Sequence, residues 1–216
     1  MLGNNRIGVF GGTFDPVHVG HLIIAEVMRH RLALSHVVFL PAGRPPHKPT
    51  QDLASNTDRV NMLRLSIADS AHFSVSTIDI VRDGPSFTAD SLQLLHAELE
   101  QHTEMYFLMG QDSLRDFPNW RRPESIARQA RLGVARRPGV DVSVDDVIEA
   151  VPELNGRVEF IEVPLIDISS RQIREAIRTG GPFRFQVVAG VADYIAEHRL
   201  YFEHAITNGS HPVAPD

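Results

Sequence analysis

The chain has 216 residues, of which 43% are hydrophobic and 22% charged, so it can form one sizeable domain with a real core. Its formal net charge of −6 argues against a general nucleic-acid-binding protein, and the absence of cysteine excludes disulfides, thiolate metal sites and a cysteine nucleophile. The first residues lack an apolar signal core and no apolar run is long enough to cross a bilayer. We therefore expect a cytoplasmic protein with neither a nucleic-acid nor a membrane partner.

Short apolar runs alternate with helical patterns up to about residue 163. The runs that we expect to form strands are residues 6–10, 36–40, 105–109, 132–135 and 158–163. The patterns that we expect to form helices are residues 21–32, 58–68, 89–100, 123–129 and 144–151. This alternation predicts an α/β fold, namely a Rossmann-like, doubly wound and mainly parallel sheet with flanking helices.

The part of the chain after residue 163 is predicted to be helical. Residues 172–178 and 187–197 show two further helical patterns, and the sequence Gly180-Gly181-Pro182 ends the first of them. These helices would give the sheet a small C-terminal helical part. We expect residues 1–202 to form a single domain and residues 203–216 to form a flexible tail.

Segment 11–21, which reads GGTFDPVHVGH, follows the first predicted strand. Pro16 cannot lie inside a helix, so we expect the next helix to begin near His18. His18 and His21 then lie on one face of its first turn. The glycines allow a ligand to approach the backbone, and a helix N-terminus attracts an anion. The segment predicts a polyphosphate site.

Each part of this segment, taken alone, has a simpler structural explanation. A glycine pair after a strand is usually a turn, and this one matches neither the dinucleotide-binding nor the P-loop pattern. Two histidines three residues apart could bind a metal, but the His-Glu-x-x-His arrangement of zinc proteases is missing. We therefore expect no metal site built from protein side chains.

Two other segments follow the ends of predicted strands. Residues 41–48 contain Pro45-Pro46-His47-Lys48, and residues 110–112 read Gly-Gln-Asp. Because parallel sheets bind ligands at the carboxyl ends of their strands, we expect both segments to lie near the polyphosphate site. Alone, a loop with two prolines is a rigid exposed loop.

Residues 168–174 read ISSRQIR and combine a helix cap with a cation. Ser169 followed three residues later by Gln172 is a capping box, which predicts the start of the helix that carries Arg174. Serine hydroxyls and an arginine can all donate hydrogen bonds to phosphate. The simpler reading is that Ser169 only caps the helix and that Arg174 lies on its solvated face.

Segment 18–21, His-Val-Gly-His, resembles the hallmark of the nucleotidylyltransferase superfamily, and residues 168–174 resemble its second hallmark. These enzymes join a nucleoside triphosphate to a phosphorylated acceptor and release pyrophosphate, with the two motifs facing each other across the triphosphate. The resemblance implies that His21 donates to the α-phosphate and that His18 orients the triphosphate. It assigns the other phosphates, or the leaving pyrophosphate, to Lys48, Ser170 and Arg174, with help from His47.

The 45–48 and 110–112 segments, residues 84–91 (GPSFTADS) and Trp120 together resemble the bacterial nicotinate-mononucleotide adenylyltransferase family, which makes deamido-NAD from ATP. The matching segments run from residue 7 to about residue 201. The resemblance implies that Thr88 and Trp120 hold the nicotinate, with the ring stacked on an indole that we expect to be partly exposed and with backbone N–H groups receiving its carboxylate. Two residues depart from the family pattern, since Phe87 replaces a usual tyrosine and Arg171 a common threonine.

The residues that we expect to carry the function fall into three groups. They are His18, His21, Lys48 and Arg174 as catalytic residues; Gly11, Gly12, Thr13, His47, Ser169 and Ser170 as ATP-binding residues; and Thr88, Gly110, Asp112 and Trp120 as acceptor-binding residues. Asp112 is expected near the ribose or the metal-bound phosphates. We expect Mg²⁺ to bind together with ATP. Asp15 could cap the histidine helix or act in the site.

Several questions of function stay open at this level. The acceptor could be nicotinate mononucleotide, nicotinamide mononucleotide or phosphopantetheine, and the sequence does not choose between the first two. A nucleotide-binding sensor without chemistry is a weaker alternative, because both motifs are retained, and a metal-dependent hydrolase is weaker still. An oligomer is compatible with the sequence, which does not determine the oligomeric state.

Overall fold

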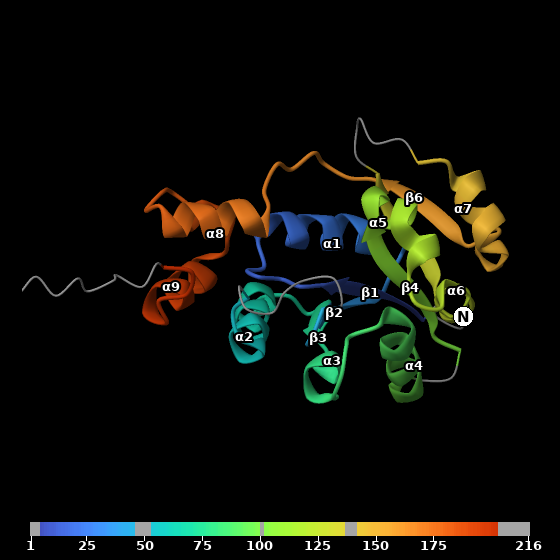
Figure 1. Ribbon diagram of the computed structural model, residues 1–216, viewed down its shortest axis with the longest axis horizontal. Helices are drawn as coiled ribbons and strands as arrows, with labels where there is room; N and C mark the ends of the chain where they lie inside the picture. Colours follow the sequence, from blue (N-terminus) through green and yellow to red (C-terminus); the bar gives the residue numbers. More distant parts are fainter. Residues whose placement is uncertain (1–4, 46–52, 100–101, 137–141, 203–216) are drawn as a thin grey trace, which may run out of the picture.

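The computed structural model describes residues 5–45, 53–99, 102–136 and 142–202. Its centre is a sheet whose order is β3-β2-β1-β4-β5-β6, with every neighbouring pair parallel (Figure 1). The strands are β1 (Arg6–Gly12), β2 (His36–Pro41), β3 (Phe73–Val75), β4 (Glu104–Gly110), β5 (Arg131–Arg136) and β6 (Val158–Glu162). The predicted Rossmann-like α/β fold is confirmed.

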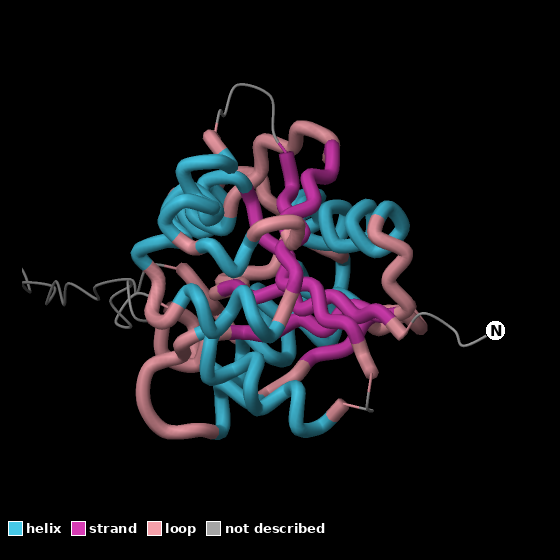
Figure 2. The backbone as a smooth tube through the Cα atoms, turned by 90° about the vertical axis from the view of Figure 1, so that its right-hand side faces the viewer, coloured by secondary structure: helices cyan, strands magenta, loops and turns pink. Residues whose placement is uncertain are grey.

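Helices cover both faces of the sheet, so the sheet is doubly wound (Figure 2). One face carries α1 (Val19–Arg31), α2 (Asn56–Ile67), α8 (Ser170–Arg178) and α9 (Ala189–Glu197). The other face carries α4 (Thr88–Glu98), α5 (Gln111–Asp116), α6 (Pro123–Gln129) and α7 (Val144–Ala150). Helices α8 and α9 lie together at one end of the molecule (Figure 1), where the sequence predicted a C-terminal helical part.

The alternation of side chains along β4 explains why both faces are covered. Tyr106 and Leu108 point into the hydrophobic cluster beneath α1, α2, α8 and α9, whereas Met105, Phe107 and Met109 point into the cluster on the opposite face. All five are at most 5% exposed. A parallel strand buried on both faces has apolar residues at successive positions, which is the pattern that predicted it.

Helix starts differ from the predicted ones by a few residues, and caps explain the differences. Helix α1 begins at Val19 because His18 is its N-cap, and α8 begins at Ser170 because Ser169 is its N-cap. Helix α2 begins before residue 58 because the Ser55 side chain accepts a hydrogen bond from the Asp58 N–H. The predicted end of α4 at residue 100 lies outside the described residues.

Among the strands and α-helices of the described residues, three short ones were not predicted, namely β3, α3 (Ile78–Val81) and α5. Strand β3 has three residues, all half-buried, which is too short for a periodic signal. In the described part of the chain, no helix is long and apolar enough to cross a membrane. The single domain over residues 1–202 stays a prediction, and the tail expected at residues 203–216 lies outside the described residues.

The strand order reverses between β1 and β4, which are neighbours in the sheet although α1 to α4 separate them in the chain. Helix α1 leaves β1 on one face, whereas α5 follows β4 on the other. The two connections diverge at the carboxyl ends of these strands. Ligands of open α/β sheets bind in the crevice at such a point.

Candidate active site

The loop after β1 brings the two motif histidines together at the start of α1. Their rings are stacked, with centroids 3.7 Å apart and an interplanar angle of 29°. The backbone N–H of His18 donates to Nδ1 of His21 at 3.2 Å. An accepting Nδ1 carries a lone pair, so the proton of the neutral ring is on Nε2. Nε2 of His21 is therefore a hydrogen-bond donor at a helix N-terminus.

Gly20 makes room for this pair. A Cβ atom at this position would lie 3.0 Å from Nδ1 of His18 and 3.3 Å from Cγ2 of Ile166. Such contacts are tighter than ordinary packing, so a side chain here would displace the His18 ring. No role could be assigned to Gly20 from the sequence, although it lies inside the histidine motif.

The Asp15 carboxylate is buried and holds the loop before His18 in place. Its Oδ1 accepts hydrogen bonds from the Tyr201 hydroxyl at 2.6 Å and from the Ala54 N–H at 3.1 Å. Asp15 is 1% exposed, and its Oδ2 lies 3.6 Å from Arg174 Nη1. These contacts give Asp15 a positioning role and leave it out of contact with solvent. Burial, and next the charge of Asp15, raise the pKa of Tyr201 well above its usual range.

The second motif contacts the first directly. The Ser170 hydroxyl donates to the carbonyl of Pro16 at 2.8 Å, and Arg174 Nη1 donates to the carbonyl of Asp15 at 2.6 Å. The expectation that the motifs face each other therefore agrees with the contacts between them. Ser169 differs from its neighbour, because its hydroxyl oxygen accepts from the N–H of Gln172 at 3.2 Å and so caps α8.

A cavity of about 680 Å³ lies at the carboxyl ends of β1 and β2, between the start of α4 and the segment that contains Trp120. Five of the predicted site residues line it: Gly11, Gly12, Thr13, Thr88 and Trp120. The predicted residues that do not line it are His18, His21, Gly110, Asp112, Ser169, Ser170 and Arg174. His47 and Lys48 lie outside the described residues, so their expected roles stay predictions.

Aromatic rings form one wall of the cavity. The half-buried Trp120 indole packs edge-to-face on Phe107, with centroids 5.9 Å apart, and lies 5.5 Å from the Phe117 ring. The partly exposed indole that the sequence predicted is confirmed. Next to it, the Arg121 guanidinium lies over the Phe87 ring, 4.4 Å from its centroid.

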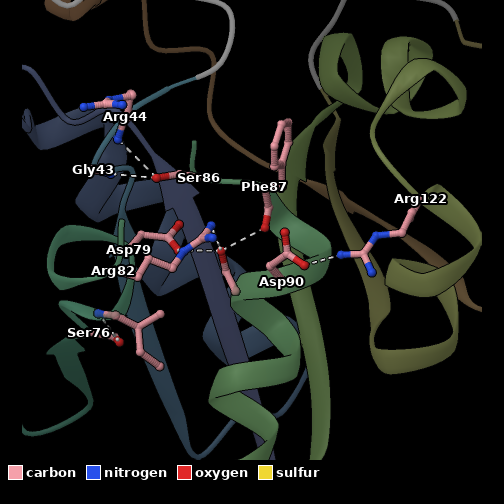
Figure 3. Close-up of polar contacts among 11 residues, drawn as sticks. Gly43, Arg44, Ser76, Asp79, Arg82, Ser86, Phe87, Asp90 and Arg122 are labelled. Atoms are coloured by element: carbon pink, nitrogen blue, oxygen red, sulfur yellow. Dashed lines mark hydrogen bonds and ion pairs between the residues drawn. The ribbon is translucent and has the colours of Figure 1, made fainter. Parts of the chain in front are cut away.

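A polar cluster that the sequence reading missed fixes the start of α4 (Figure 3). The buried Asp79 carboxylate is ion-paired with Arg82 at 2.8 Å and accepts a hydrogen bond from Ser91 at 2.6 Å. The Ser86 hydroxyl oxygen accepts from the N–H of Gly43 at 2.9 Å. The cluster therefore ties the loop after β2 to α4. Its only sequence signal was an Asp and an Arg three residues apart.

Gly110 and Asp112 lie at the end of β4 and the start of α5. Gly110 is the N-cap of α5, and a Cβ atom built on it would meet nothing within 4 Å. The Asp112 side chain is 63% exposed and lies 3.6 Å from Arg115. Among the described residues, no three His, Asp or Glu side chains are close enough to hold a metal ion. Contacts of Gly110 and Asp112 with an acceptor stay predictions.

Comparisons with known proteins show which family of proteins has this fold and these motifs. A family model described as cytidylyltransferase-like matches residues 9–176. The fold and the two motifs therefore place the chain among the cytidylyltransferase-like proteins.

Individual relatives identify a particular family within this class of proteins. The probable nicotinate-nucleotide adenylyltransferase of Thermomicrobium roseum is 47% identical over 91% of this chain and 92% of that protein. The protein of the same description from Roseiflexus sp. is 43% identical over 90% of this chain and 97% of its own length. The chain belongs to the nicotinate-nucleotide adenylyltransferase family, which confirms the resemblance seen in the sequence.

A solved structure supports the fold independently. Plasmodium falciparum nicotinic acid mononucleotide adenylyltransferase complexed with NaAD superposes with a TM-score of 0.73, covering 91% of this chain and 97% of that one. The identity is only 18%, so this likeness bears on the fold alone.

Proposed function

We propose that this protein transfers the adenylyl group of ATP to nicotinate mononucleotide, giving deamido-NAD and pyrophosphate for NAD biosynthesis. The observation that carries the proposal is the placement of the β1–α1 segment. Gly11 to Thr13 line the same cavity as Thr88 and Trp120, while His18 and His21 stack where the segment enters α1. The segment therefore lies between a cavity with an aromatic wall and a helix N-terminus suited to phosphate.

The acceptor supplies its own nucleophile in this reaction. A phosphate monoester has a second pKa of about 6, so it is largely ionised at neutral pH and needs no general base. One of its oxygens forms a bond to the α-phosphorus of ATP. The bond from that phosphorus to the oxygen bridging to the β-phosphate breaks, and pyrophosphate leaves with the electron pair. The protein supplies positioning and charge stabilisation.

We assign the charge stabilisation to the histidine pair. Nε2 of His21 carries the ring proton, because Nδ1 is occupied by the His18 N–H, and so can donate to an oxygen of the α-phosphate. His18 orients the triphosphate beside it. Ser170 and Arg174 hold the far phosphates in this proposal. Both now donate to carbonyls of the 15–16 segment, so phosphate would compete with those bonds or share the donors.

Mg²⁺ would enter with ATP. Magnesium is commonly held by substrate phosphates, retained waters and one or two carboxylates. A magnesium ion held mainly by substrate phosphates suits the described residues. The Asp15 carboxylate already accepts two hydrogen bonds, and the exposed Asp112, two residues after the end of β4, is the acidic candidate for a contact with the ion. When bound, the ion would neutralise charge on the phosphates and on the leaving pyrophosphate.

Location in the cytoplasm and the oligomeric state remain predictions.

The direct test is product analysis by mass spectrometry. The protein is incubated with ATP, Mg²⁺ and either nicotinate mononucleotide, nicotinamide mononucleotide or phosphopantetheine. We expect deamido-NAD from the first acceptor and a lower rate with the others. Product from phosphopantetheine alone, or AMP without any dinucleotide, would contradict the proposal.

The role of His21 has a matched control on the same helix. His21→Ala removes the proposed donor at the N-terminus of α1, whereas His30→Ala removes an exposed imidazole in its last turn. We expect a fall of about 100-fold or more in kcat for the first variant, as for other lost donors to developing charge, and an unchanged kcat for the second. Equal kcat values for two folded variants would refute the role of His21.

A further inference from the structure

Arg59 is a buried arginine near the start of α2, and its side chain is only 1% exposed. Within the described part of the chain, no carboxylate forms an ion pair with its guanidinium. Burial lowers the pKa of Arg59, and the charge of Asp15 opposes this shift. Apolar side chains of similar volume often replace buried ionic groups without loss of stability. Stability alone therefore does not explain why a cation lies at this position.

The Arg59 guanidinium joins the loops that follow the neighbouring strands β1 and β2. Its Nη1 donates to the carbonyl of Thr13 at 2.8 Å, and its Nη2 makes a longer hydrogen bond to the carbonyl of Gly43 at 3.4 Å. Nη2 also donates to Oδ1 of Asn56 at 2.5 Å, which fixes the group on its own helix. Because the donors belong to one rigid plane, they set the separation of two carbonyls from different loops.

Both of these loops line the cavity, whereas Arg59 does not. Thr13 contributes to the wall, as do Ala42 and Pro45 on either side of Gly43 in the chain. Arg59 lies behind this wall, so it contacts neither substrate in the cavity. Any effect of Arg59 on the reaction must therefore act through the two loops.

The loop after β2 has a second support, which comes from the segment before α4. The N–H of Gly43 donates to the hydroxyl oxygen of Ser86 at 2.9 Å (Figure 3), while its carbonyl accepts from Arg59. Both backbone polar groups of Gly43 are thus fixed. Arg59 ties the loop to the β1 side of the cavity, and Ser86 ties it to the α4 side.

We infer that Arg59 is a positioning residue for adenylyl transfer, because it sets the separation of the loops after β1 and β2 and so the alignment of the two substrates between them. The inference rests on the proposed function and adds a residue outside the cavity. In-line attack depends on the relative placement of the two reactants, and a displacement of about 1 Å can cost about 100-fold in rate. The main effect of losing Arg59 should therefore fall on kcat.

The test makes one chemical change at two positions of α2. Arg59→Lys keeps the charge but replaces two donor nitrogens by one, whereas Arg64→Lys changes an exposed arginine on the same helix. With ATP and nicotinate mononucleotide, we expect kcat to fall by about 10- to 100-fold in Arg59→Lys and each KM to change by less than about threefold. Arg64→Lys should match the unaltered protein. Rates are measured well below the melting temperature of each variant, which circular dichroism provides.

Ser86→Ala shows whether the effect passes through the loop after β2, because it releases Gly43 and leaves Arg59 in place. If both residues act by fixing this loop, the double variant should lose less in kcat than the product of the two single losses. Should Arg59→Lys fail to fold, Arg59→Met replaces it in the same comparison, since it removes the buried charge together with its cost of burial.

Two results would overturn the inference. One is a kcat in Arg59→Lys, or in its replacement, equal to that of Arg64→Lys. The other is a loss in the double variant equal to the product of the single losses. If the unaltered protein forms no dinucleotide from ATP and nicotinate mononucleotide, the proposed function itself fails.

Discussion

The hydroxyl of Tyr201 provides the sharpest test of how the histidine loop is held. It donates to the buried Oδ1 of Asp15 at 2.6 Å, across 186 residues of sequence. Tyr201→Phe removes this donor and leaves the ring, so packing changes little. The variant therefore isolates one hydrogen bond to a carboxylate that is 1% exposed.

The expected cost follows from the charge and the burial of the acceptor. Hydrogen bonds to charged groups contribute about 1.5–3 kcal/mol, and water cannot easily replace the lost donor here. For a chain of this length, about 2–4 °C of melting temperature corresponds to each kcal/mol. Tyr201→Phe should thus lower the melting temperature by roughly 3–12 °C. The kcat should fall as well, because Asp15 precedes His18 by three residues in the loop.

Thermal unfolding followed by circular dichroism at pH 7 measures the effect. Tyr194→Phe is the matched control, since its hydroxyl donates to Asp58 at 2.9 Å and accepts from Asn61 at 3.1 Å at a site that water reaches more easily. We expect a loss of less than about 1 kcal/mol for the control, in the range of ordinary hydrogen bonds. If Tyr201→Phe is no less stable than Tyr194→Phe, the reasoning about the buried carboxylate is wrong.

Three further predictions follow from single contacts. Gly43→Ala should cost about 3 kcal/mol or more in urea unfolding, because its Cβ would lie 1.9 Å from the Asp79 carbonyl oxygen. Gly20→Ala should lower kcat about tenfold or more by displacing His18, with a stability change within about 1 kcal/mol because alanine favours the helix. Above pH 10 the unfolded chain loses the Tyr201 proton that the folded chain keeps, so the free energy of unfolding should fall by up to about 1.4 kcal/mol per pH unit, and less steeply in Tyr201→Phe.

Each of these three predictions has a control or a result that would contradict it. Gly190→Ala, where the nearest atom is 3.7 Å from the added Cβ, should not destabilise the protein, and a similar cost at both glycines would contradict the Gly43 argument. An unchanged kcat in Gly20→Ala would show that the His18 ring adapts without loss. Identical alkaline slopes with and without the Tyr201 hydroxyl would show that this group does not carry the pH effect.

Features of the fold that depend on neighbours in the chain could be predicted from the sequence. The two-sided apolar pattern of β4 and the alternation of strands and helices follow from local periodicity. The helix start after Pro16 and the cap at Ser169 follow from turn and capping chemistry. Strand β3 was missed because three half-buried residues give no such period.

The candidate site also has features that the sequence predicts and features that only the structure shows. Its histidine motif could be found because it is contiguous in the chain, and Trp120 because its polar neighbours predicted a partly exposed ring. The Asp79 cluster and Gly43 were missed, since a glycine whose added Cβ would lie 1.9 Å from the Asp79 carbonyl oxygen looks like any loop glycine in the sequence. The role of Asp15 was open for a similar reason, because its partners Ala54, Arg174 and Tyr201 lie far along the chain.

The sequence by itself determined the class of fold, the phosphate-binding character of the first loop and the family, because these depend on residues that are close together in the chain. Only the tertiary structure decided what holds that loop and which side chains pack together along the cavity. The Ser170–Pro16 contact spans 154 residues, and the Arg121 guanidinium meets Phe87 across the segment that contains β4 and α4. Such pairs have no period and no fixed spacing, so they exist only once the sheet has brought its strand ends together.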